Sequence, residues 1–264
     1  MISFSVLHTA AVAMRRYIFR IVNVLACAAG PVGLAGITGL AGCGGTAPPS
    51  VSAGDFSDGG LRDASDRSAE RNREGAFIER VVGFSPGLGA GFGQDAMPWV
   101  VFGGPRGAGP SSGGTDVVSL GTGGSIVVAF EKRPIIDAPG DDFLVFENAF
   151  RFGTGGTRTY VELARVSVSD DGVNWVSFPC NVQTYAGCAG SQPVYANVDT
   201  NTIDATHSAR AGGDPFDLAS VGLWRARFLR LDDLGTIPGS AEESSGKAGF
   251  DLDSIAVIHG ADSP

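Results

Sequence analysis

Two short segments combine carboxylates with strand-forming residues, and they are the stretches best suited to chemistry. In residues 140–148 both alternating faces are apolar, which predicts a strand buried on both sides that ends directly in an acid. In residues 249–257 two acids share one side of a regular strand, and the apolar phase then slips, which predicts a bulge or a loop-to-strand junction beside them. The acids concerned are Asp142, Glu147, Asp251 and Asp253.

Calcium binding is the chemistry that these four acids favour. A buried carboxylate is costly unless it is paired or bound to a cation, and calcium accepts carboxylate and carbonyl oxygens in loose geometry. We therefore predict a calcium site formed by the four acids. Two other interpretations stay open. The acids can form turns or pair with Arg225, Arg227 and Arg230 on the penultimate predicted strand. Alternatively, Asp142 and Asp251 can form a catalytic pair of the glycosidase kind.

Other catalytic motifs have less support. His207 and His259 are the histidines that follow the N-terminal apolar run, and neither lies in a recognisable nucleophile or metal motif. The glycine-rich stretch 87–93 is followed by neither Lys-Ser/Thr nor a helix pattern, so we expect a loop packed close to backbone instead of a phosphate site. We therefore predict that the protein is not an enzyme, with a hydrolase of envelope polysaccharide as the less favoured alternative.

The long irregular segment 181–221 is the other candidate site, because long loops in compact domains are often functional. Cys180 and Cys188 lie near its start, and an exported location permits a disulfide between them that would hold Tyr185 on a rigid loop. Aromatic faces beside amide and acid groups suit sugar recognition, although such side chains are also ordinary in exposed loops. The candidate ligand-binding residues are Tyr185, Tyr195, Asn197, Asp199 and Arg210.

A β-hairpin over residues 160–179 belongs to the framework that must position these groups. Residues 164–168 alternate between apolar and polar side chains, which predicts a strand with one face in a core and the other in water. A tight turn follows at 170–172, in which Gly172 can take a positive φ, and the alternation then resumes. The hairpin indicates where the sheet lies and leaves the ligand open.

Further strands complete an all-β domain over residues 76–260. About eight or nine strands without a convincing helix favour a single antiparallel jelly-roll β-sandwich. No strand–helix alternation indicates a parallel sheet, and no internal repeat indicates a propeller. The predicted strands outside the hairpin are 77–84, 98–102, 115–120, 125–130, 142–150, 224–231 and 253–259.

Residues 1–42 are predicted to be an export signal that precedes the folded domain. Three arginines come before a mostly apolar run that ends in Leu40-Ala41-Gly42-Cys43, which resembles the lipobox of bacterial lipoproteins. That resemblance implies that Cys43 is lipidated and becomes the first residue of the mature chain. A transmembrane anchor is the alternative for the apolar run. The arginine pair also fits twin-arginine export, and Met14 is a plausible true start.

Residues 43–75 are predicted to be a flexible tether from the membrane, because they hold too few large apolar groups to offset the entropy of ordering. A short tail follows the domain at 261–264. Loss of the signal removes three arginines and no acid, which lowers the net charge from −9 to −12 and argues against nucleic acid as a partner. The predicted partners are the membrane, through the lipid on Cys43, and a glycan or surface molecule.

Three segments in order resemble the galactose-binding-like superfamily, which includes discoidin domains and many carbohydrate-binding modules. They are 166–178, 224–235 and 250–260. Residues 91–105 and 140–150 are also similar to a group of bacterial cell-surface proteins. The resemblance implies a jelly-roll sandwich, often with a structural calcium, that commonly binds glycans or other surfaces through loops at one end. The long 181–221 insertion departs from a compact discoidin domain.

The expected protein is thus an exported lipoprotein of the bacterial cell envelope with a calcium-stabilised, non-catalytic domain that binds a glycan or a surface. The main alternative is a structural envelope domain without a small ligand.

Overall fold

The main sheet has five antiparallel strands in the order β1-β3-β12-β8-β9. It belongs to a computed structural model that describes residues 75–235 and 249–261. Buried apolar side chains recur at every second residue along the three central strands, which places one face in a core. The strands are β1 (Arg80–Ser85), β3 (Ser125–Ala129), β12 (Phe228–Asp233), β8 (Ala164–Ser169) and β9 (Val176–Ser177).

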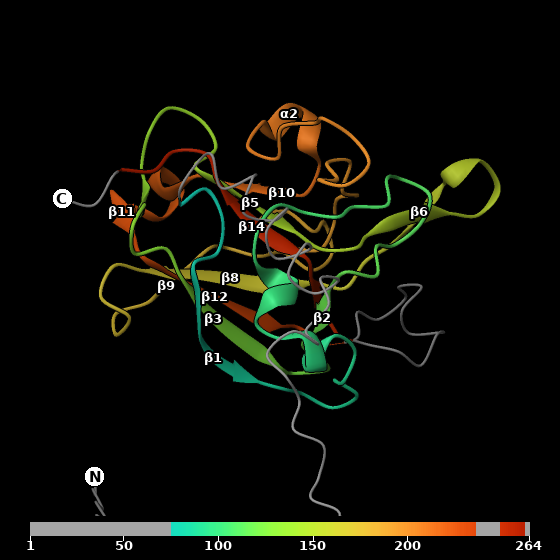
Figure 1. Ribbon diagram of the computed structural model, residues 1–264, viewed down its shortest axis with the longest axis horizontal. Helices are drawn as coiled ribbons and strands as arrows, with labels where there is room; N and C mark the ends of the chain where they lie inside the picture. The colour runs from blue at the N-terminus through green and yellow to red at the C-terminus, as the bar shows by residue number, and fades with distance from the viewer. Residues whose placement is uncertain (1–74, 236–248, 262–264) are drawn as a thin grey trace, which may run out of the picture. The chain divides into compact units, whose positions relative to one another are not determined.

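A second antiparallel sheet, in the order β10-β5-β14, packs over the first and makes the domain a β-sandwich. Figure 1 shows the two sheets as separate layers. Phe143 and Val145 of the second sheet share a buried cluster with Leu229 and Leu231 of the first. The Phe143 ring stacks on Phe216 with centroids 5.1 Å apart. The strands are β10 (Asp214–Phe216), β5 (Phe143–Phe146) and β14 (Ser254–Val257).

Strand β5 is buried on both faces, as its sequence predicts. Leu144 and Phe146 point away from the main core into a smaller cluster with Val194 and Ala211. Ala211 ends the short helix α2 (Ser208–Ala211), so part of the long segment 181–221 serves as a cover for the second sheet (Figure 1). This cover leaves β5 no exposed face, which explains its uninterrupted apolar run.

The predicted hairpin is confirmed, but its connection spans 170–175, which is longer than the tight turn expected at 170–172. Strands β8 and β9 pair antiparallel, with Ser167 opposite Ser177. The connecting turn is held by the carboxylate of Asp171, which accepts hydrogen bonds from the backbone amides of Val173 and Asn174 at 2.8 and 2.7 Å. These bonds, with that from Asn174 the strongest, hold the pKa of Asp171 below its usual range. Gly172 has the expected positive φ of 75°.

The predicted strand at 98–102 is wrong, because Trp99–Val101 form the 3-10 helix η3. Val100 and Val101 are buried whereas Trp99 is 66 % exposed, so the apolar run marks a core contact without a strand. Helix α2 is also absent from the sequence prediction. The remaining elements are η2 (Gln94–Ala96), β2 (Val118–Ser119), β4 (Ile135–Ile136), β6 (Phe150–Phe152), η4 (Thr154–Gly156), β7 (Arg158–Tyr160), η5 (Leu218–Val221), β11 (Arg225–Ala226) and β13 (Asp251–Leu252).

The predicted export signal, the lipid site at Cys43 and the tether lie outside the described residues. Within the part of the chain that the structure describes, no helix has the length and apolar character needed to cross a bilayer. The jelly-roll connectivity and the domain boundaries at 76 and 260 stay predictions.

The interlocked aromatic core predicts a steep stability cost for Phe143→Ala. Its ring is fully buried against Phe178 and Phe216, so the free energy of unfolding should fall by about 3–5 kcal/mol in urea titrations. The control Val173→Ala alters a side chain that is 77 % exposed and should change it by less than about 0.5 kcal/mol. If the two substitutions lowered the free energy of unfolding equally, the assignment of Phe143 to the core would be contradicted.

Candidate functional site

Several apolar rows that face the sandwich core end in carboxylates. Along β5 the inward positions are Phe143 and Val145, and the next inward position is Glu147. Along β12 the inward positions Leu229 and Leu231 lead to Asp233. The core therefore changes from apolar to acidic at one end.

The neighbouring strands repeat this pattern at the same end. Asp214 is directly opposite Val145 on β10, and Ala164 at the start of β8 is opposite Asp233, which places Glu162 just beyond that pair. The chain passes from β13 to β14 at Asp253, whose amide donates to the carbonyl of Phe146 at 3.0 Å. We call these residues the acid layer: Glu147, Glu162, Asp214, Asp233, Asp251 and Asp253, of which all but Asp251 are buried.

Members of the acid layer anchor loops through backbone amides. Asp233 accepts hydrogen bonds from the amides of Gly123, Gly235 and Phe250 at 2.7 to 2.8 Å. Asp253 accepts one from the amide of Arg106 at 2.9 Å. Such bonds offset the cost of burying a carboxylate. They agree with the turn-forming interpretation of the acids.

Glu147 lacks this compensation. Its side chain is 1 % exposed, and neither carboxylate oxygen has a hydrogen-bond partner. Burial raises the pKa of Glu147 well above its ordinary value, and the nearby acids Glu162 and Asp251 raise it further. Among the described residues, its two oxygens are the buried side-chain atoms left without a partner. This carboxylate is the least explained polar group in the described fold.

Asp142 belongs to a different acidic group at the opposite end of β5. It is fully buried and accepts hydrogen bonds from the amides of Ala138 and Leu218 and from Nδ1 of His259 at 2.8 to 3.0 Å. One carboxylate oxygen from each of Asp137, Asp142 and Asp217 lies within 4.8 Å of the others. This second group has the donor types to hold a metal ion.

The four acids predicted to share calcium are thus divided between the two ends of the sandwich. Asp142 and Glu147 are five residues apart along β5, a separation of about 16 Å in a strand. The structure places Glu147 near Asp251, and Asp253 at the same end. The arginines of the alternative interpretation pair elsewhere, because Arg225 and Arg227 contact Asp170, and Arg230 contacts Asp232.

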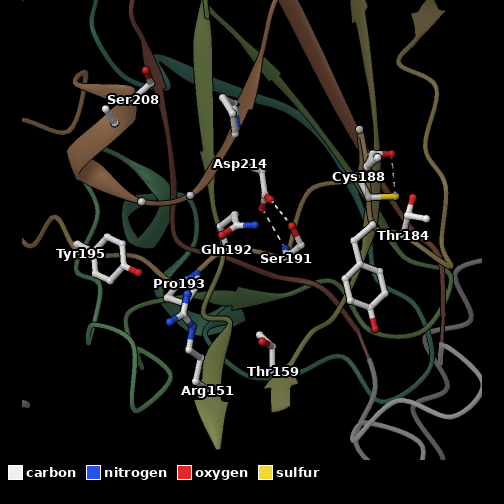
Figure 2. Close-up of a pocket in the computed structure, with 17 residues that line it drawn as sticks. Arg151, Thr159, Thr184, Cys188, Ser191, Gln192, Pro193, Tyr195, Ser208 and Asp214 are labelled. Carbon is white, nitrogen blue, oxygen red and sulfur yellow. Dashed lines mark hydrogen bonds between the residues drawn. The ribbon is translucent and has the colours of Figure 1, made fainter. Parts of the chain in front are cut away.

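A groove of about 690 Å³ brings together residues from distant parts of the chain. Figure 2 shows Tyr195 and Arg151 on one side, Thr184 and Cys188 on the other, and Asp214 between them. Arg151 and Thr159 come from β6 and β7, while Asp214 comes from β10. The polar groups that line it include Arg151, Thr159, Thr184, Ser191, Gln192, Ser208 and Asp214.

A disulfide shapes one wall of the groove. Cys180 and Cys188 are bonded, with an S–S distance of 2.02 Å, as the sequence predicts. Within this loop Tyr185 has a φ of 65°, which is strained for a bulky residue. Its half-buried side chain packs beside Cys188 and Leu163 and also lines the groove. The disulfide indicates an extracytoplasmic location.

The structure brings two of the five predicted ligand-binding residues to the groove, Tyr185 and Tyr195. Asn197 instead donates from its side-chain amide to the carbonyl of Gly107 at 2.9 Å. Asp199 pairs with the Arg106 guanidinium. Arg210 is exposed on α2 and does not line the groove, although its neighbours Ser208 and Ala209 do. Sequence reasoning did not find the groove residues Arg151, Thr159, Ser191, Gln192 and Asp214.

Asp214 belongs to both the acid layer and the groove. Its carboxylate accepts hydrogen bonds from the amides of Gly190 and Ser191 at 2.7 and 3.0 Å and from the Ser191 hydroxyl. Burial nevertheless raises the pKa of Asp214 to about 6. This residue fixes the backbone of 190–192 against the groove floor, which gives it a positioning role.

No protein-family model and no curated protein sequence matches this chain. A solved structure with similarity is the C-terminal domain of a chitobiase from Bacteroides fragilis, at 17% identity and a TM-score of 0.25. The match covers 53% of this chain and 65% of that chain, which is less than two thirds of its length. The galactose-binding-like assignment stays a prediction.

The buried Asp214 predicts a pH dependence of stability. The folded state keeps its proton up to about pH 6, whereas the unfolded chain loses it near 3.8, so stability falls as pH rises through this window. The contribution of this group is about 3 kcal/mol. Urea unfolding in EDTA from pH 4 to 7 should show a smaller fall for Asp214→Asn than for the wild type. An equal or larger fall in the variant would contradict the assignment.

Proposed function

We propose that the domain binds a glycan in the groove between the Cys180–Cys188 loop and the segment 191–215. The observation that carries this proposal is the meeting of two tyrosines with several polar side chains around one concavity. Its volume of about 690 Å³ is in the range of about 300–1,000 Å³ typical of small-ligand sites.

The side-chain chemistry around the groove suits a carbohydrate. Aromatic rings such as Tyr195 can cover the apolar face of a sugar ring while the phenol oxygen bonds to a hydroxyl. Arg151, Ser191 and Gln192 supply donors and acceptors around them. The disulfide supports binding because it limits the entropy lost when Tyr185 contacts a ligand.

Binding without catalysis is the proposed activity. The carboxylate of Asp214 is engaged by backbone amides of the groove wall, which favours a positioning role over proton transfer. Asp142 and Asp251, the alternative catalytic pair, lie toward opposite ends of the β5–β14 ladder. A glycosidase needs its two carboxylates on either side of one bond.

The proposed setting is the bacterial cell envelope, with the jelly-roll domain held at a membrane by a lipid on Cys43. The disulfide supports an extracytoplasmic domain. We include calcium as a stabilising ion, for which the donor oxygens of the two acidic groups are suited.

Tyr195→Ala should weaken glycan binding about tenfold, because it removes an aromatic face from the groove. A glycan array identifies a bound soluble oligosaccharide, and isothermal titration then gives the dissociation constants. The control is Trp224→Ala, which removes an exposed aromatic ring outside the groove and should leave the affinity unchanged.

Two results would contradict the binding proposal. One is no array signal above that of an unrelated acidic protein. The other is an equal loss of affinity in Tyr195→Ala and Trp224→Ala.

Cys43→Ala should release the protein from the membrane fraction, because it removes the proposed lipid attachment. Cell fractionation followed by immunoblotting measures the distribution. Cys27→Ala changes a cysteine inside the predicted signal and should leave the protein in the membrane fraction. Retention of the Cys43→Ala protein would sink the lipoprotein proposal.

A further inference from the structure

We propose that Glu147, Glu162 and Asp251 bind a divalent cation within the acid layer, and that calcium is the ion their donors fit. This inference deepens the calcium part of the proposed function and is independent of whether the groove binds a glycan. It differs from the sequence prediction, because Asp142 and Asp253 are not part of the site and Glu162 is.

The unpartnered carboxylate of Glu147 is the first observation. The side chain is 1 % exposed and both of its oxygens lack a hydrogen-bond partner, although Asp233 and Asp253 in the same layer are bonded to backbone amides. An uncompensated buried polar group in a native fold calls for an explanation. A cation supplies the missing partner for both oxygens.

The placement of the neighbouring acids is the second observation. Glu162 precedes β8 in one sheet, Glu147 follows β5 in the other, and Asp251 lies on β13, so three separate segments contribute one carboxylate each. Asp251 is held in place by the Asn148 side-chain amide, which donates to its Oδ2 at 3.1 Å. Carboxylates gathered from several elements, together with carbonyl oxygens and water, are the ligands that calcium prefers.

The second acidic group provides a contrast. Asp142, its buried member, already accepts hydrogen bonds from two backbone amides and from His259. Asp137 is exposed and Asp217 is half-buried, and no buried oxygen of this group lacks a partner. The buried carboxylate of this group is therefore satisfied as a loop anchor, whereas that of Glu147 is not, and we assign the cation to the acid layer. Among the described residues the oxygens of Glu147, Glu162 and Asp251 do not all lie within 4.8 Å of one another, as those of the second group do, so a bound cation would draw these three side chains together.

The proposed site lies directly behind the groove wall. A Cβ atom on Gly190 would meet the carbonyl oxygen of Glu162 at 1.9 Å, so the two backbones are in close contact. Gly190 also donates from its amide to Asp214, which lines the groove. A cation on Glu162 would thus stabilise the segment that shapes the groove.

The test uses the full chain, first analysed for metal content as purified and then stripped with EDTA. Calcium chloride at millimolar concentration should raise the thermal midpoint of the stripped protein by several degrees, as expected for a ligand that binds only the folded state. Isothermal titration with calcium should show binding. No calcium binding and no rise in midpoint would overturn the proposal.

Two charge-removing substitutions separate the two acidic groups. Glu147→Gln keeps the shape of the side chain and should abolish both the rise in thermal midpoint and the calcium binding seen by isothermal titration. The control Asp137→Asn should retain both. A calcium-dependent rise in the thermal midpoint that persists in Glu147→Gln, or that is lost in Asp137→Asn, would overturn the assignment. If Glu147→Gln does not fold, Asp251→Asn provides the same comparison, and an undiminished calcium response in that variant would also count against the site.

Discussion

Carboxylates at one end of the sandwich core impose the constraint around which the loops are arranged. A buried acid must find donors or a cation, and in this fold most donors are backbone amides from segments distant in the sequence. Asp233 fixes the turn at Gly123 and the approach of Phe250, while Asp214 fixes the turn at Gly190. The acid layer is therefore what joins the two sheets to the loops that form the groove.

The parts of the fold that depend on local periodicity are predictable from the sequence. Alternation identifies the β8–β9 hairpin, and a continuous apolar run identifies β5 as buried on both faces. Residues 98–102 mislead because a five-residue apolar run has no period long enough to separate a strand from a 3-10 turn. The inward phase of β8 extends back to Glu162, a signal that could have added this residue to the predicted acids.

The groove depends on contacts between distant segments, and these cannot be obtained from local patterns. Tyr185 and Tyr195 could be selected by residue type and loop position, but Arg151 and Thr159 reach the same cavity from a hairpin that precedes the predicted loop. By contrast, the predicted strand 142–150 already places Asp142 and Glu147 five residues apart, about 16 Å along a strand, so the sequence could have separated these two acids. Topology decides which acids share a site.

The account depends most on which group offsets the cost of burying the Glu147 carboxylate. Crystal structures determined from crystals grown with calcium and with EDTA show this directly. The account predicts an ion at 2.3–2.6 Å from oxygens of Glu147, Glu162 and Asp251 in the calcium crystals, the usual range for calcium. In EDTA the ion should be absent and the Gly190–Gln192 segment less well ordered. An unoccupied site in calcium, with Glu147 hydrogen-bonded to a neighbouring group in both crystals, would contradict the account.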